Sequence, residues 1–356
     1  MARNQNCCSS CSSQLGEWVK GKVIGSGSFG TVRLAMNKAS GSLFVVKSAE
    51  SDAGIRALED EANVLRSLNS PYVVRCLGTR LLKRSKGEGT LDVFMEYMAG
   101  GSLSDVAEKF GGALDSGVIK LYTREILHGL KYLHENGIAH CDLKCKNVLL
   151  GSNGDIKLAD FGCSKRLLND PKISNGESMH SWKSIGGTPL WMAPEVLRNE
   201  GLDFASDIWS LGCLVIEMAT GRPPWNGLDV SNPMAAVLKI ACGNEKPQFP
   251  IGFCLEGLDF LEKCLERNPE RRWTAEELLN HPYISGKFLT SSWKECACSP
   301  SSVLDFRIHE EGYDSDDSQD EFPGRNPFST RLSREKNRMV DNDFESSEDW
   351  ITVRSI

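Results

Sequence analysis

The sequence contains no apolar run that approaches the ~18 consecutive residues needed to cross a membrane. Its first residues also lack the apolar stretch of a secretory signal peptide. Both absences favour a cytoplasmic, or else nuclear, protein without a transmembrane segment. Aromatic residues make up only 8% of the chain, but 40% of its 356 residues are hydrophobic, which is ample for a buried core.

The chain also lacks an excess of basic residues. Its 41 Lys and Arg are outnumbered by 48 Asp and Glu, and residues 301–356 carry the whole net charge of −7. Residues 1–300 are therefore neutral overall and contain no basic stripe. Because binding to nucleic acids depends on clustered positive charge, the sequence gives no reason to expect a nucleic-acid partner.

The 13 cysteines follow neither a disulfide nor a zinc pattern. Their number is odd, and no histidine lies near the cysteines at either end, so a disulfide framework and a metal site are both disfavoured. Cys213 and Cys264 fall inside apolar helical patterns and should be buried thiols. Cys7, Cys8 and Cys11 could accept palmitoyl groups and hold the N-terminus at a membrane, although a disordered leader with spare thiols is the simpler explanation.

Composition divides the chain into a leader, a body and a tail. We predict a flexible leader over residues 1–17, a folded body over residues 18–284 and a mostly disordered, acidic and Ser-rich tail over residues 285–356. The tail ends in an apolar group that follows several acids, in the sequence ESSEDWITVRSI. This end could dock on a partner protein, fold back on the body or remain solvated.

The body itself predicts an α+β protein with two lobes. In residues 18–98, short β-branched runs separated by Gly and Ser predict a five-stranded antiparallel sheet. Apolar residues at spacings of three and four predict one helix over residues 53–68 of this lobe. Residues 99–284 are expected to be mainly helical.

One helix of the second lobe is expected at its centre. Residues 206–220 are apolar nearly all round, so this helix should be buried on every side. Ser206 and Asp207, at its start, are expected to cap it.

A glycine-rich segment, GSGSFG at Gly25–Gly30, lies between two of the predicted strands. A dinucleotide-binding fingerprint would open a helix here, but the residues from Thr31 onward resume a strand. This placement fits a loop that folds over nucleotide phosphates. The spacing alone is weak, since an ordinary glycine-rich hairpin contains the same pattern.

Lys47 ends an apolar strand, where a buried ammonium needs an anion. Glu61 follows on the predicted helix and could face Lys47 if the helix packs on the sheet. Alternatively, Lys47 reaches solvent from the end of its strand, and Glu61 joins Glu59 and Asp60 on a solvated helix face.

Two further motifs follow in a fixed order. HCDLKCKNVLL places Asp142 and Asn147 five residues apart, and KLADFG places Asp160 before Phe and Gly. A third segment, TPLWMAPE, ends at Glu195. Each motif alone could be a turn, but their order makes coincidence improbable.

This ordered set resembles eukaryotic protein kinases over residues 18–284. Lys144 resembles the lysine of the serine/threonine class, and GTPLWMAPEV together with DFGCSK is similar to plant mitogen-activated protein kinase kinase kinases of the MEKK type. The resemblance implies a two-lobed fold, ATP and Mg²⁺ as cofactors, and a MAP kinase kinase as protein substrate. The tail could then dock a partner kinase. A catalytically weak scaffold acting through the acidic tail is the alternative.

The resemblance also implies roles for individual residues. Asp142 would orient the attacking hydroxyl, and Lys144 would offset charge on the γ-phosphate. Asn147 and Asp160 would hold metal ions. The nucleotide would be bound by these residues: Ile24, Gly25, Ser26, Gly27, Ser28, Phe29, Gly30, Thr31, Val32, Lys47 and, through Lys47, Glu61.

Other residues are given structural roles by the same resemblance. His140 would be a packing residue, and Asp207 would brace residues 140–150, here called the catalytic segment. Glu195 and Arg272 would form a buried ion pair. Two more residues would lie at the rim of the substrate sites: Thr188 beside Asp142, and Met95 beside the adenine pocket.

The chain departs from the family pattern at two positions. Val45 replaces a usual small residue and would narrow the adenine slot. Cys141 stands where most kinases carry an arginine that grips a phosphorylated activation segment. We therefore expect phosphorylation within that segment to contribute less to activation than in relatives with the arginine. The candidate phosphorylation sites are Ser174, Ser178, Ser181 and Ser184.

Overall fold

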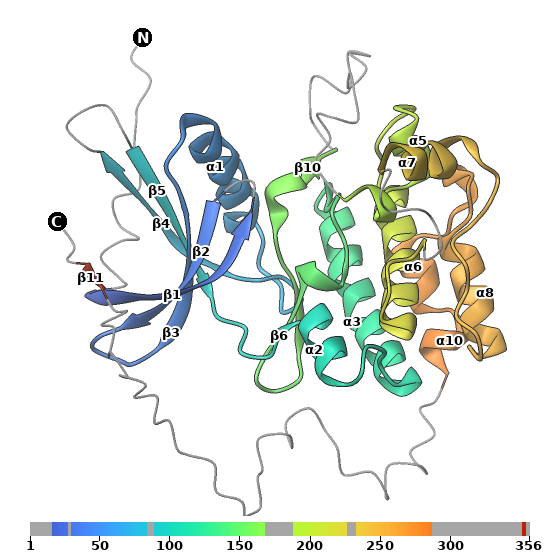
Figure 1. The fold of residues 1–356 in the computed structure, drawn as a ribbon, viewed down its shortest axis with the longest axis horizontal. Coiled ribbons are helices and arrows are strands. Elements are labelled where there is room, and N and C mark those ends of the chain that lie inside the picture. Colours follow the sequence, from blue (N-terminus) through green and yellow to red (C-terminus); the bar gives the residue numbers. More distant parts are fainter. Residues whose placement is uncertain are drawn as a thin grey trace, which may run out of the picture.

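A computed structural model gives the fold (Figure 1). It describes residues 16–27, 30–83, 89–167, 188–225, 233–286 and 351–353. Several residues singled out above lie outside the described residues: Cys7, Cys8, Cys11, Ser28, Phe29, Ser174, Ser178, Ser181 and Ser184.

The first lobe is an antiparallel sheet with one helix packed against it. Its strands are β1 (Trp18–Gly27), β2 (Gly30–Asn37), β3 (Leu43–Ala49), β4 (Cys76–Lys83) and β5 (Gly89–Glu96). Within the sheet they lie in the order β1-β2-β3-β5-β4, and helix α1 (Asp52–Arg66) packs against β3, β4 and β5. The predicted five strands and single helix are confirmed.

The second lobe is built mainly from helices. They are α2 (Leu103–Lys109), α3 (Ser116–Glu135), α5 (Pro194–Leu197), α6 (Ala205–Thr220), α7 (Pro233–Cys242), α8 (Leu255–Cys264), α9 (Ala275–Leu279) and α10 (Pro282–Ser285). Short strands lie where this lobe meets the first: β6 (Gly101–Ser102), β7 (Ile138–Ala139), β8 (Val148–Leu150), β9 (Ile156–Leu158) and β10 (Lys165–Arg166). The α+β fold with two lobes is therefore as predicted.

Helix α6 lies at the centre of the second lobe. Nearly all of its residues are buried, as its apolar sequence predicts. The predicted capping is wrong, because the helix begins at Ala205 and neither Ser206 nor Asp207 caps it. Ser206 instead donates to the carbonyl oxygen of Asp203, and the Asp207 carboxylate is used by backbone amides of the segment that follows β7.

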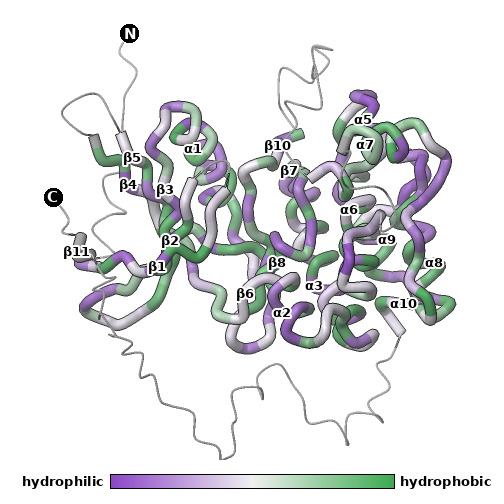
Figure 2. The backbone as a smooth tube through the Cα atoms, viewed as in Figure 1, coloured by the Kyte–Doolittle hydropathy of each residue, from purple (hydrophilic) through white to green (hydrophobic). Residues whose placement is uncertain are grey.

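Two apolar clusters hold the molecule together. The larger one extends through both lobes, and Figure 2 accordingly shows hydrophobic segments in each of them. The smaller one lies on the other face of the sheet and is built around Trp18, whose ring makes edge contacts with Phe44 and Phe94 at 5.7 and 5.5 Å between centroids. Trp18 thereby fixes the first residue of β1.

Within the predicted tail, the structure describes strand β11 (Ile351–Val353), which adds to the outer edge of β1. The pairs are Trp18 with Val353, Val19 with Thr352 and Lys20 with Ile351, in antiparallel register. This short segment therefore returns to the body. Among the described residues, no helix is long and apolar enough to span a membrane.

Candidate active site

Lys47 and Glu61 form a buried ion pair between the sheet and α1. The Lys47 ammonium lies 2.7 Å from Oε2 and 3.0 Å from Oε1 of Glu61, and also 3.0 Å from Oδ1 of Asp160. Both members of the pair are buried, at 7% and 2% exposure. The alternatives of a lysine that reaches solvent and a glutamate on a solvated face are therefore excluded for these two residues.

Local sequence explains why the pair forms. The run from Phe44 to Lys47 is buried, so it carries the lysine into the interior rather than to the rim. Ser51 caps the N-terminus of helix α1, since its side chain accepts a hydrogen bond from the backbone amide of Gly54. Its buried residues share one face, and Glu61 lies on that face because it is three residues after Leu58. Tertiary packing thus turns one carboxylate inward.

The charges around Lys47 reinforce one another. Burial alone would lower the pKa of Lys47, but the carboxylates of Glu61 and Asp160 raise it above its usual value. Burial would likewise raise the pKa of Asp160, but Lys47 lowers it below its usual value. At neutral pH the ammonium and the Asp160 carboxylate are therefore both charged.

Asp142 lies at the centre of a hydrogen-bond network between the catalytic segment and Thr188. Asn147 donates its amide nitrogen to Oδ2 of Asp142 at 2.9 Å and to its backbone oxygen at 2.7 Å. Lys144 donates to Oδ2 at 2.8 Å, and the Thr188 hydroxyl donates to Oδ1 at 2.8 Å. Lys144 also contacts the Thr188 hydroxyl directly. The four side chains are thus held as a unit.

The carboxylate of Asp207 binds the backbone of the catalytic segment at its start. This carboxylate, fully buried, accepts from the amides of His140 at 2.8 Å and Cys141 at 2.9 Å, and lies 3.0 Å from Nε2 of His134. Burial would raise the pKa of Asp207, but these hydrogen bonds, led by that from His134, lower it. Asp207 therefore stays ionised and fixes the segment before Asp142.

Cys141 adopts a backbone conformation that is unusual for a residue with a side chain. Its φ is 66°, in the left-handed region. The hydrogen bond from the backbone amide of Cys141 to the Asp207 carboxylate holds this conformation. The thiol donates to the carbonyl oxygen of Ala139 at 3.5 Å. Burial, followed by the charge of Asp207, raises the pKa of the thiol well above its usual value. Cys141 is therefore a neutral thiol at physiological pH.

His140 has the packing role that the resemblance implies. It is fully buried, its Nε2 lies 3.0 Å from the carbonyl oxygen of Ala159, and its ring lies 4.9 Å from that of Phe161. These contacts tie the catalytic segment to the strand and turn that carry Asp160. His140 thus positions other residues, and its Nδ1 also accepts a hydrogen bond from the backbone amide of Asp142 at 3.4 Å.

Asp160 and Asn147 fit the needs of a hard metal ion. Asp160 has a left-handed φ of 62°, which aims its carboxylate at Lys47, and its side chain is 47% exposed. The side-chain nitrogen of Asn147 donates hydrogen bonds to Asp142, so its side-chain oxygen is left to coordinate a metal ion. A carboxylate and an amide oxygen suit Mg²⁺ when nucleotide phosphates and water complete the shell. The described residues contain no cluster of three or more His, Cys, Asp or Glu that could bind a metal without a nucleotide.

The glycine-rich segment joins β1 to β2 as a hairpin. Gly27 pairs with Gly30, and the residues between them, Ser28 and Phe29, lie outside the described residues. At Gly30 the φ is 145°, and a Cβ would lie 2.4 Å from the carbonyl oxygen of Ser48. Gly30 is therefore required for close packing of β2 on β3. Gly25, Ser26, Thr31 and Val32 continue the hairpin, and Ile24 precedes it with a half-exposed side chain.

The remaining predicted residues lie on the neighbouring strands β2, β3 and β5. Val45 on β3 pairs directly with Met95 on β5, and both side chains are buried in the larger apolar cluster. Val32, partly buried, packs against the same cluster. Together they form an apolar surface on the side of the sheet that carries Lys47, as expected for contact with a purine.

Glu195 and Arg272 form the buried ion pair that the resemblance implies. The guanidinium is bidentate, with distances of 2.7 and 3.1 Å to the two carboxylate oxygens. Arg272 also donates to the backbone oxygens of Glu266 at 2.8 Å and Ala205 at 2.7 Å. The pair therefore joins the segment after Thr188 to the start of α6 and to the loop before α9.

Glu217 is a functional neighbour that sequence reasoning missed. It is the lone acid in the apolar part of α6, and its Oε2 accepts from the Cys145 amide at 3.1 Å and the Trp191 indole at 2.9 Å. Burial raises the pKa of Glu217. A carboxylate within an otherwise apolar helix was the signal for it.

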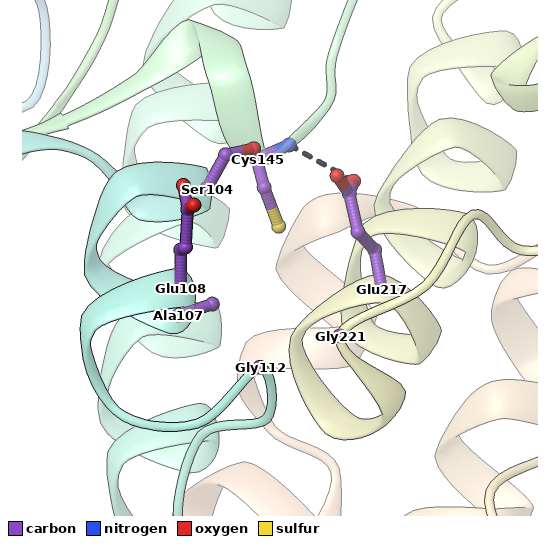
Figure 3. A pocket seen from close by; sticks show the side chains of 7 residues that line it. All are labelled: Ser104, Ala107, Glu108, Gly112, Cys145, Glu217 and Gly221. Atoms are coloured by element: carbon purple, nitrogen blue, oxygen red, sulfur yellow. Dashed lines mark hydrogen bonds between the residues drawn. The ribbon is translucent and has the colours of Figure 1, made fainter.

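A cavity of about 290 Å³ adjoins Glu217 behind the catalytic segment. Figure 3 shows α2 on one side of it and the end of α6 on the other, with the Cys145 thiol and the Glu217 carboxylate pointing toward it. Its lining residues are Ser104, Ala107, Glu108, Gly112, Cys145, Glu217 and Gly221. Two of the seven lining residues, Glu108 and Glu217, are acids.

Comparison with known proteins bears on the whole body. The sequence model of the protein kinase domain family matches residues 18–284. Over 351 residues the chain is 40% identical to mitogen-activated protein kinase kinase kinase 18 of Arabidopsis thaliana, with 95% of this chain and 99% of the relative aligned. It is 42% identical over 272 residues to mitogen-activated protein kinase kinase kinase 17 of the same plant, covering 76% of this chain and 70% of the relative. A third relative, mitogen-activated protein kinase kinase kinase A of Dictyostelium discoideum, is 42% identical over 277 residues, which cover 75% of this chain and 28% of the relative.

Proposed function

Because the chain belongs to the protein kinase family, we propose that it is a serine/threonine kinase that acts as a mitogen-activated protein kinase kinase kinase and phosphorylates MAP kinase kinases. The names of its relatives support this place in a cascade. The network centred on Asp142 supports the chemistry, since it unites the side chains that a phosphoryl transfer to a hydroxyl requires.

On the side of the protein substrate, Asp142 receives or orients the proton of the attacking hydroxyl. Its carboxylate is held on one oxygen by Thr188 and on the other by Lys144 and Asn147, so it cannot rotate away from the incoming group. A carboxylate fixed before the reaction costs no reorganisation during it. Lys144, which already touches Asp142, offsets negative charge on the transferring group.

On the nucleotide side, Lys47 binds phosphate oxygens of ATP. Glu61 holds the Lys47 ammonium in place. When Asp160 coordinates a metal ion, the N–H that now contacts Asp160 becomes available to a phosphate oxygen. Mg²⁺, when bound by Asp160 and Asn147, neutralises phosphate charge. The glycine-rich hairpin between β1 and β2 closes over the phosphates, and the apolar surface at Val32, Val45 and Met95 receives the adenine.

The inactive scaffold has no support in this site. A pseudokinase would lack or misplace one of the four groups that bind ATP and metal or orient the hydroxyl. Lys47, Asp142, Asn147 and Asp160 are all present and joined through hydrogen bonds to their expected partners. Among the catalytic positions only Cys141 is unusual, and its backbone amide donates to Asp207.

A phosphotransfer assay tests the proposal. The full chain is incubated with labelled ATP, Mg²⁺ and a panel of purified MAP kinase kinases whose own catalytic lysine has been replaced. We expect label on a serine or threonine in the activation segment of at least one of them. Transfer to other proteins but to no MAP kinase kinase would keep the kinase and reject its place in the cascade, and no transfer to any protein would reject both.

Replacing Glu61 should weaken ATP binding. In Glu61→Gln, Lys47 loses its charged anchor, and a hydrogen bond to a charged group contributes about 1.5–3 kcal/mol. We expect the KM for ATP to rise roughly 10-fold to 100-fold. Glu59→Gln is the matched control, because Glu59 is two residues away on the exposed side of the same helix. Equal KM values for the two variants would contradict the role given to Glu61.

The absence of an arginine at Cys141 predicts a weak dependence on phosphorylation. We expect a variant with alanine at Ser174, Ser178, Ser181 and Ser184 to keep activity within about 10-fold of the parent. A phosphate on any of these serines has no arginine at position 141 to pair with, so its removal costs no such ion pair. Initial rates on the same substrate measure this. Activity abolished by the four alanines and restored by aspartates would reject the prediction.

A further inference from the structure

The outer edge of β1 is occupied by the chain's own last strand. β1 has β2 on one side, and on the other side only β11 pairs with it among the described residues. The three pairs join Trp18, Val19 and Lys20 to residues more than 330 positions later in the sequence. Figure 1 shows β11 at the end of the molecule remote from the helical lobe.

The two sides of this contact suit one another as strands. β11 consists of Ile, Thr and Val, which are all β-branched and favour extended backbone. On the other side, Trp18 is anchored by Phe44 and Phe94, and the guanidinium of Arg80 lies 5.0 Å from its ring. The first residue of β1 is therefore positioned by contacts that do not involve β11. Unpaired edges of this kind accept an added strand from their own chain or from another.

Charge favours the same register. β1 carries Lys20 and Lys22, whereas the sequence just before β11 carries Glu345, Glu348 and Asp349. The pairing is antiparallel with Lys20 opposite Ile351, so Lys22 lies on the N-terminal side of β11. Attraction between these acids and lysines would favour this register over the reverse one.

We propose that the edge of β1 at Trp18–Lys20 is a strand-binding surface whose occupant is Ile351–Val353, docked reversibly and assisted by charge. Three residue pairs make few hydrogen bonds, so the strand can leave the edge without unfolding the lobe. Residues 287–350 form the connection, and closing a connection of this length costs little more than closing one half as long. The dock thereby controls whether the end of the tail is available to a partner.

Hydrogen exchange on the full chain tests the dock. Amides of successive residues point alternately toward and away from a neighbouring strand, so Thr352→Pro/Val353→Pro removes at least one donor that faces β1. We expect the outward amides of Trp18–Lys20 to exchange at least 10-fold faster in this variant than in the parent. Ser346→Pro/Ser347→Pro is the matched control, with two prolines in the tail outside the strand. Unchanged exchange at Trp18–Lys20 in the strand variant would overturn the proposal.

A peptide added in trans provides the second arm. A labelled peptide of residues 345–356 should bind the Thr352→Pro/Val353→Pro chain, whose edge is free, at least fivefold more tightly than the parent chain, whose edge is occupied. Raising the salt concentration should weaken this binding, since salt screens the acids and lysines. Equal affinity for the two chains would overturn the proposal. Neither arm depends on ATP turnover, so each outcome is separate from that of the kinase assay.

Discussion

Replacing Asp142 with asparagine is expected to lower the rate of phosphotransfer by ~10²–10⁴-fold, the range that a positioned acid or base contributes. Asparagine preserves the size of the side chain, but its single amide oxygen can accept either from Thr188 or from Lys144 and Asn147, because these donors contact different oxygens of Asp142. It cannot take up a proton or supply a negative charge to the hydroxyl. The loss should therefore fall on kcat, measured at saturating ATP and substrate, while the KM for ATP changes little, because Asp142 serves the hydroxyl and reaches the nucleotide side only through Lys144 and Asn147.

Asp115→Asn is the matched control for this substitution. Asp115 is exposed and caps α3 by accepting from the amide of Gly117, a role that asparagine performs equally well. Its variant should retain full activity. If Asp142→Asn kept more than about a tenth of the parent rate, then the hydroxyl would not depend on Asp142, and the general-base assignment would fail.

The order of motifs in the sequence predicted most of this site. Lys47, Asp142, Asn147 and Asp160 lie in segments whose spacing is informative because each segment is a short strand end or a tight turn, so little chain separates the motif from its chemistry. Local structure therefore translates directly into position. The contact of Lys47 with Glu61 also followed from sequence, since one helical face decides where Glu61 points.

Contacts between distant elements were predicted only where the resemblance implied them, as for Asp207 with the catalytic segment and for Glu195 with Arg272. Glu217 supports the Cys145 amide across 72 positions, and no local pattern indicated this contact. The strand at Ile351–Val353 was expected only as one of several alternatives, because three residues are too few for a strand to be read from periodicity. Ser206 and Asp207 were assigned to capping because they stand at the start of a helix, but burial gave Asp207 a different partner.

Cys141 shows how a departure in sequence can leave geometry intact. The arginine that most kinases carry at this position contacts the activation segment through its side chain. The backbone of the same residue is part of the catalytic segment. In this chain the backbone amide of Cys141 donates to Asp207, and its φ is 66°. The carboxylate of Asp142 is therefore positioned without an arginine at position 141. What the chain lacks is the cation that would bind a phosphate on the activation segment.

The largest loss of stability is expected from removing Arg272. Its side chain is fully buried and balances Glu195, which is nearly so, at 0% and 8% exposure. Arg272→Ala leaves the carboxylate buried without a partner, which destabilises a protein by about 3–5 kcal/mol. We expect the free energy of unfolding in urea to fall by this amount and the Tm to fall by on the order of 10 °C. Because the pair joins the segment after Thr188 to α6, activity should fall as well.

Arg271→Ala controls for the loss of an arginine at this turn, since Arg271 is exposed and should cost less than about 0.5 kcal/mol. A double-mutant cycle then isolates the pair. If the buried carboxylate without its partner is the main cost, Glu195→Ala/Arg272→Ala should be destabilised by clearly less than the sum of the single variants, because neither charge is left alone. Additive losses would instead assign the effect to the backbone oxygens of Glu266 and Ala205, which also lose Arg272 as their donor.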